Sequence, residues 1–449
     1  MLLLMAMTLV VMACTGVDDL ADTSGQERSA QQQPVAFSAY VNRSTTRGGA
    51  TGQLTIDGTG GTTSLRTCGF GVFGYYTGTA GYSQAALPNF MYNQKVTYNS
   101  TNWEYSPVKY WPNGEGEATG TQNHYLTFFA YAPYVDVNSM GRIDDAPATT
   151  EIDESTTGIT ALTRVGDCGD PMVSYHVNFN PDQQVDLCWA MPREDLTKPS
   201  IADRVAFDFQ HALAALNVQI DADVDVTSHA TNDTKDGYTR IWVRSITFEG
   251  FATKGKLNLN NSASIPHWYG LGCDCDLTST PITIYDGRSN RHEGIAQALN
   301  ERPTGLNPEL VQSVPYTVNP EGGTPEAIFS STTTGVTTSL VNLFSSSAID
   351  APIYVIPTND PLRVTIVYDV ETYDPKLTSQ YLSDGRTHGS TIENSISAYI
   401  TNGTTPIVME AGKQYTLNLH LGVASVKMNA SVTPWADEIG NNVNVNVPE

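Results

Sequence analysis

Apolar residues occur at every second position in most segments of the chain, and Gly, Pro and Asn separate these segments. The alternation is clearest over residues 35–41, 216–226, 362–370 and 415–421. Period-two alternation places apolar side chains on one face of a β-strand. No segment has a helical period over more than two or three turns, and the only helical turn that we expect is a short one at residues 211–216. The pattern predicts an all-β protein made of packed sheets.

Two kinds of interruption divide the 449 residues. Residues 192–200 combine two prolines with charged side chains between strand-like segments, which is typical of a domain boundary. Residues 260–340 are rich in Ser, Thr, Asn, Gly and Pro, and we expect them to form long surface loops. The chain is long enough for two sandwich domains, which we place at residues 34–196 and 197–449.

The first 33 residues lack this alternation and precede the two expected domains. Residues 2–13 form an apolar run of 12 residues, which is too short for a membrane-spanning helix of about 20 residues but suits the apolar region of a secretory signal. The run ends in Val11-Met12-Ala13-Cys14, which has the form of a lipobox, although no Lys or Arg precedes it. We therefore expect a lipoprotein signal with the lipid on Cys14, followed by a polar tether up to residue 33.

An alternating segment, residues 35–41, follows the tether and predicts a first strand. The polar residues 42–49 come next and contain Arg43 and Arg47 beside small residues. We expect an exposed loop of this composition to be open to cleavage by a trypsin-like protease. The alternative is an ordinary first strand with its turn.

Charge narrows the range of partners. The chain has 24 basic and 47 acidic residues, a formal net charge of −23, and 40% of its residues are hydrophobic. This composition is typical of a folded protein, and the negative field repels both nucleic acid and anionic membrane surfaces. We expect no nucleic-acid partner, and a lipid is the most direct means of membrane attachment.

The sequence contains no catalytic motif that we recognise. The eight histidines are scattered, and no HExxH motif, nucleophile elbow, P-loop or dinucleotide fingerprint occurs. Cys273 and Cys275 lack a second pair at zinc-finger spacing, and Cys168 with Cys188 is the disulfide that we expect in an exported protein. We therefore expect no enzyme, no cofactor and no metal site.

Six segments taken together resemble the fimbrillin family, the type V pilus subunits that are made as lipoprotein precursors. The matching segments are residues 11–14, 69–73, 105–112, 126–133, 207–213 and 415–435.

The resemblance implies two transthyretin-like Greek-key β-sandwich domains in tandem. It also implies export through the periplasm to the cell outer membrane with palmitate on Cys14, and then cleavage by an Arg-specific protease. The cut would follow Arg47 or Arg43 and remove the strand at residues 35–41, whereas a cut at Arg28 would leave that strand attached. Subunits would then polymerise by donor-strand exchange into a cell-surface fimbrium.

The resemblance implies a C-terminal donor strand, and Val443, Val445 and Val447 alternate as a donor should. The tail is equally consistent with an ordinary last strand of its own domain. A tip or anchor subunit of the same pilus, with a host protein or glycan as ligand, also fits the sequence. A further alternative is a lipid-anchored glycan-binding protein with an aromatic platform. The platform residues would be Trp103, Trp111, Trp268 and Tyr269.

Overall fold

The computed structural model describes residues 33–41, 53–58, 62–112, 124–136, 141–142, 157–197, 204–222, 238–261, 265–271, 275–286, 341–342, 352–373, 391–421 and 426–434. Within these ranges almost every regular element is a strand, and the helical elements are the single turn α1 (Leu65–Cys68) and the short 3-10 helix η3 (Pro181–Gln183). The predicted all-β fold is confirmed. No helix in the described ranges is long and apolar enough to cross a membrane.

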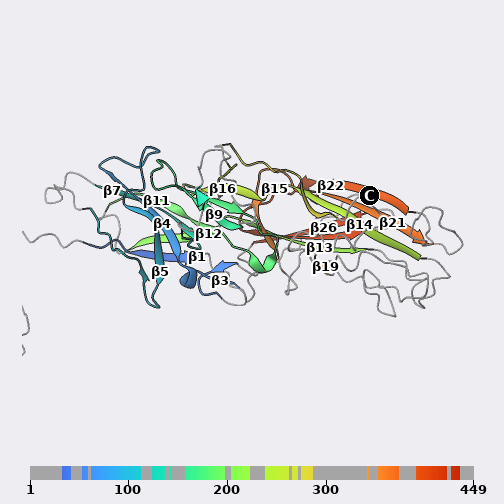
Figure 1. Cartoon of the computed structure of the whole chain (residues 1–449), viewed down its shortest axis with the longest axis horizontal. Coiled ribbons are helices and arrows are strands. Elements are labelled where there is room, and N and C mark those ends of the chain that lie inside the picture. The colour runs from blue at the N-terminus through green and yellow to red at the C-terminus, as the bar shows by residue number, and fades with distance from the viewer. Residues whose placement is uncertain are drawn as a thin grey trace, which may run out of the picture.

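A seven-stranded sheet forms the N-terminal end of the molecule (Figure 1). Its strands are, in spatial order, β1 (Phe37–Val41), β12 (Val205–His211), β11 (Cys188–Leu196), β7 (Tyr125–Ala132), β4 (Phe70–Gly78), β5 (Met91–Tyr98) and β6 (Trp103–Glu104). β1 and β12 run parallel, with Phe37 beside Val205 and Val41 beside Phe209. The first strand of the chain therefore pairs with a strand that comes much later in the sequence.

A second sheet and a small ladder accompany the first. The five-stranded sheet contains β17 (Trp268–Tyr269), β16 (Lys254–Asn258), β10 (Met172–His176), β9 (Gly158–Leu162) and β8 (Gly141–Arg142). The ladder pairs β2 (Leu54–Thr55) with β3 (Thr63–Ser64). Because β12 and β16 pair with strands that precede residue 196, strand pairing crosses the expected boundary at 196/197. The division into domains and the Greek-key connections stay predictions.

The C-terminal half contributes a six-stranded sheet, a four-stranded sheet and one hairpin. The six-stranded sheet contains β15 (Phe251–Ala252), β20 (Ile353–Pro357), β13 (Ala214–Ala222), β25 (Lys413–Leu421) and β26 (Val426–Pro434), with β19 (Val341–Asn342) on β13. The other contains β18 (Ile282–Asp286), β14 (Tyr238–Glu249), β21 (Arg363–Tyr373) and β22 (Thr391–Tyr399). The hairpin pairs β23 (Thr401–Asn402) with β24 (Thr405–Pro406), and its turn contains Gly403 at φ 63°. A positive φ in this turn explains the Asn402-Gly403 sequence.

The helical turn predicted at residues 211–216 is wrong. β12 ends at His211 and β13 begins at Ala214, so two strands nearly meet there. Residues 212–216 are all fully buried. A continuous apolar run is compatible with a strand that is buried on both faces, and its periodicity alone does not distinguish this from a short helix.

Two hydrophobic cores lie on opposite faces of the seven-stranded sheet. On β7, Phe128 and Ala130 face one core while Phe129 and Tyr131 face the other. The larger core continues from this sheet into the C-terminal half along the elongated molecule (Figure 1). We call the smaller one the β1 core. It consists of Val35, Phe37, Ala39, Val41, Leu54, Leu65, Phe70, Val72, Met91, Val96, Trp111, Leu126, Phe128, Ala130, Ala132, Cys188, Ala190, Val205, Phe207 and Phe209.

Candidate assembly site at the first strand

β1 and the residues just before it form backbone hydrogen bonds on both sides. On one side the Val205 amide donates to the Ala36 carbonyl at 2.8 Å, at the start of the parallel pairing with β12. On the other side the Val35 amide donates to the Lys109 carbonyl at 2.9 Å, and the Trp111 amide donates to the Gln33 carbonyl at 3.0 Å. The segment around β1 thus lies between two parts of the chain. One is β12, its neighbour in the sheet, and the other is residues 109–111, which follow β6 at the far edge of the sheet.

Alternate side chains of this segment fill the β1 core. Val35, Phe37, Ala39 and Val41 are 1–4% exposed, whereas Tyr40 on the outer face is 58% exposed. The Phe37 ring centroid lies 5.4 Å from that of Tyr105 and 5.6 Å from those of Phe128 and Phe207. Aromatic pairs at these separations stabilise a core beyond the area that they bury. The strand predicted from alternation at residues 35–41 is confirmed, and Phe37 is its central packing residue.

Tyr105 connects β1 to the opposite edge. Its hydroxyl donates to the Val35 carbonyl at 2.7 Å and lies 3.3 Å from both the amide nitrogen and the carbonyl oxygen of Lys109. Burial raises the pKa of Tyr105 above its ordinary value, so the phenol remains a donor at neutral pH. Sequence reasoning did not identify Tyr105 as a partner of β1, because nothing local to residues 103–112 indicates that contact.

Removal of this segment would leave two unpaired backbone edges and an uncovered apolar groove. Each backbone hydrogen bond contributes about 0.5–1.5 kcal/mol, and each buried Val or Phe side chain about 1.5–3 kcal/mol. An open edge beside an apolar groove binds another strand or leads to aggregation. The geometry therefore suits exchange of one strand for another with the same apolar spacing.

The other residues predicted for the site lie outside the described residues. These are the lipidation residue Cys14, the cleavage residues Arg43 and Arg47, and the donor residues Val443, Val445 and Val447. Their roles stay predictions.

The aromatic platform of the glycan-binding alternative does not form as expected. Trp111 and Trp268 are each only 5% exposed, and they lie in different sheets or cores. Trp103 packs against Phe70 and Tyr98. The side chains that looked like a binding surface are largely packing residues, since a tryptophan in an all-β protein buries more apolar area than most residues.

The expected disulfide between Cys168 and Cys188 is wrong. Both are free thiols, with Cys168 exposed and Cys188 buried in β11, and Cys68 is also free. Cys275 is disulfide-bonded, and its partner lies outside the described residues. Burial, and next the Asp186 carboxylate, raise the pKa of Cys188 well above its ordinary value. Spacing along the chain does not determine which cysteines meet, since that depends on strand register.

The described residues also contain a potential metal-binding group that sequence reasoning missed. Asp186, Cys188 and His211 each offer one ligand atom, and these atoms lie within 4.8 Å of one another. The short Asp-x-Cys spacing was visible in the sequence, but the histidine joins it only through the pairing of β11 with β12.

Comparisons with known proteins give a family match and several similar proteins. A sequence profile of the family described as fimbrillin-like matches residues 66–267, from α1 almost to β17. The fimbrium subunit Fim1C of Phocaeicola vulgatus is 27% identical over 243 residues, which are 51% of this chain and 55% of that protein. The match therefore spans about half the length of this relative.

A crystal structure of a fimbrial protein from Bacteroides vulgatus is also similar. It covers 90% of this chain and 99% of its own, with 20% sequence identity and a TM-score of 0.48. The family match and the sequence relative support one assignment: over residues 66–267 the chain is similar to the fimbrillin-like family.

Proposed function

We propose that the chain is a structural and adhesive subunit of a cell-surface fimbria, in whose precursor β1 occupies the place that a strand of another subunit takes after maturation. One observation carries this proposal. The β1 segment forms backbone hydrogen bonds on both sides, and every second side chain of the segment is buried in the β1 core. Its relative Fim1C is named as a fimbrium subunit, which fits the same role.

Maturation would follow from the order of features along the chain. Cys14 receives the lipid and attaches the precursor to the outer membrane. Cleavage after Arg47 or Arg43 then releases the lipid, the tether and all of β1, because β1 ends at Val41. Cleavage after Arg28 would leave β1 in place, so it would release a subunit with a filled groove.

The incoming strand would be the C-terminal tail of another copy or of an accessory subunit. Val443, Val445 and Val447 repeat the two-residue spacing of Phe37, Ala39 and Val41. Valine is smaller than phenylalanine, so this tail would fill the space around Tyr105, Phe128 and Phe207 less completely than Phe37 does. An accessory subunit with an aromatic residue at the matching position would bind more tightly.

The partners are other pilus subunits, with a host protein or glycan as ligand for adhesion, and with no nucleic acid. The role of the chain as stalk, tip or anchor depends on whether it is cut and whether it donates a strand. Both properties are open to direct measurement.

The test is an Arg43→Ala, Arg47→Ala double variant expressed in the producing cell. It should accumulate as a lipidated, monomeric precursor, because the groove remains filled by β1. Arg28→Ala is the matched control and should assemble normally, since that arginine precedes β1. Fimbriae built from double-variant chains that still carry β1 would contradict the proposal.

A further inference from the structure

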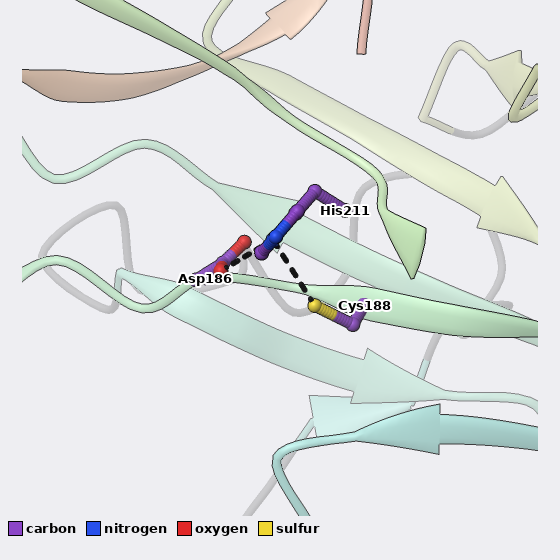
Figure 2. A group of neighbouring side chains, drawn as sticks. All are labelled: Asp186, Cys188 and His211. Carbon is purple, nitrogen blue, oxygen red and sulfur yellow. Dashed lines mark hydrogen bonds and ion pairs between the residues drawn. The ribbon is translucent and has the colours of Figure 1, made fainter. Parts of the chain in front are cut away.

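Three potential metal ligands converge at one end of the β1 core. The His211 imidazole lies between the other two side chains, with Nδ1 2.7 Å from Asp186 Oδ2 and 3.5 Å from Cys188 Sγ (Figure 2). All three residues are buried: His211 is 7% exposed, Asp186 2% and Cys188 0%.

Strand register explains why they meet. Cys188 and His211 are direct cross-strand partners in the antiparallel pair of β11 and β12, and such partners have adjacent side chains. On β12, His211 has the same alternation as Phe207 and Phe209, so it belongs to the face that lines the β1 core. Phe209 pairs with Val41, the last residue of β1, so the cluster lies just past that end of the strand.

One polar atom of the cluster is not satisfied by the described residues. Asp186 Oδ2 accepts a hydrogen bond from the Leu54 amide at 2.8 Å as well as facing His211. Asp186 Oδ1 is fully buried and has no hydrogen-bond partner within the described part of the chain. A buried carboxylate oxygen without a partner is costly, whereas a bound cation would satisfy it.

We propose that Asp186, Cys188 and His211 form a binding site for a divalent transition-metal ion, with zinc as the best fit. A thiolate, an imidazole nitrogen and a carboxylate are the three zinc ligands used in proteins, and three protein ligands leave a fourth position for water. The Cys188 thiol proton would leave to solvent as the sulfur–metal bond forms.

The distances are close to those that a tetrahedral zinc site needs. Bond lengths of about 2.3 Å to sulfur and about 2.0 Å to nitrogen place those two ligand atoms about 3.5 Å apart. The observed separation of Cys188 Sγ and His211 Nδ1 is 3.5 Å. The nitrogen and the coordinating carboxylate oxygen would sit about 3.3 Å apart in such a site. The unpaired Asp186 Oδ1 would be that oxygen, and the 2.7 Å contact between Oδ2 and Nδ1 would be lost as Nδ1 binds the ion.

A bound ion would fix three parts of the chain at the end of the β1 core. It would join β11 to β12 through Cys188 and His211, and it would hold the Leu54 segment through Asp186. This consequence for the core holds whether or not β1 is exchanged.

The competing explanation is a buried hydrogen-bonded network without metal. To distinguish the two, the full chain is unfolded with a chelator and refolded with or without Zn²⁺. Bound metal is measured by elemental analysis, and stability by thermal unfolding. The proposal predicts about one firmly bound zinc per chain and a higher Tm with zinc than without it.

Variants assign the ligands. Asp186→Asn and Cys188→Ala should each weaken zinc binding by at least about 100-fold, the upper end of what the loss of an outer-shell partner costs. Cys168→Ser, which changes an exposed free thiol away from the cluster, should bind zinc as the unchanged chain does. Equal zinc binding by all four proteins, or no stoichiometric zinc in the unchanged chain, would overturn the proposal.

Cobalt substitution keeps the test decisive should a variant fail to fold. Co²⁺ in the unchanged chain should give the charge-transfer absorption of a cobalt–thiolate bond. That band should persist in Cys14→Ser, Cys68→Ser, Cys168→Ser and Cys273→Ser. Because Cys275 is disulfide-bonded, this leaves Cys188 as the source of the band. Absence of the band, or its loss in any of these four variants, would refute the assignment.

Discussion

Phe37 illustrates at the residue scale how β1 is held. Its side chain is 1% exposed and contacts the rings of Phe128 on β7, Phe207 on β12 and Tyr105 just after β6. We predict that Phe37→Ala lowers the free energy of unfolding of the precursor by about 3–5 kcal/mol, because it creates a cavity in a packed core. Denaturant unfolding measures the change, and faster trypsin cleavage in residues 42–49 should accompany it.

Tyr40→Ala is the matched control for that prediction. It truncates an aromatic residue on the same strand whose side chain is 58% exposed. The free energy of unfolding should change by no more than about 0.5 kcal/mol. Similar losses in the two variants would mean that Phe37 does not anchor the strand.

Glu194 gives a prediction on pH. Glu194 is an exposed residue whose carboxyl is partly desolvated by its neighbours. This desolvation, followed by repulsion from Asp195 and Asp170, raises its pKa, and a hydrogen bond from Asn260 opposes the shift. A carboxyl with a raised folded-state pKa binds its proton more readily in the folded than in the unfolded protein. Its ionised form is therefore destabilising at neutral pH, and this cost disappears as the pH falls through the folded-state pKa.

We accordingly predict that Glu194→Gln raises the Tm at pH 7. The gain should shrink as the pH approaches about 4, where the unfolded carboxyl also becomes protonated. Thermal unfolding of both proteins across this range measures it. A variant that is less stable at pH 7 and more stable in acid would show that the Asn260 contact outweighs the repulsion.

At the scale of elements, alternation predicted most strands but not their partners. The strand at residues 35–41 was evident in the sequence, yet its pairing with β12 and with residues 109–111 was not. A period of two defines the two faces of a strand and says nothing of which distant strand lies beside it. For the same reason the Asp186–Cys188–His211 group was missed, because it depends on the register between β11 and β12.

The predictions of an aromatic platform and of a helical turn at residues 211–216 failed for a related reason. Whether an aromatic residue is a binding surface or part of the core depends on what covers it, as Trp111 and Trp268 show. The apolar run at residues 212–216 looked helical because burial on both faces removes the alternation that marks a strand.

Removal of β1 as a whole should change how the chain associates. A chain that begins at Gly48 should self-associate, because both edges of the groove are open. A synthetic peptide of residues 34–41 should restore a monomer, while the same peptide with Phe37→Ser should not. Sedimentation measures the outcome, and a stable monomer from Gly48 onwards without any peptide would contradict strand exchange.

Charge matters at the scale of the whole molecule. The full chain has a formal net charge of −23, and residues 1–47, with four acidic residues and three arginines, hold only −1 of it. Two cleaved subunits therefore repel each other as they approach. We predict that polymerisation of cleaved subunits is faster at about 0.15 M salt than at about 0.01 M, where the Debye length is about 30 Å rather than about 8 Å. Light scattering follows the rate, and a rate that falls with salt would indicate that assembly depends on opposite charges at the interface.

The mature subunit should lack β1, and the most direct test is the N-terminus of protein recovered from the producing cell's surface. Intact mass and terminal sequencing provide it. We predict a start at Gly48 or Ser44 without lipid. A start at acylated Cys14 in all of the material would contradict the claim, and the chain would then be an anchor subunit or a lipid-anchored binding protein.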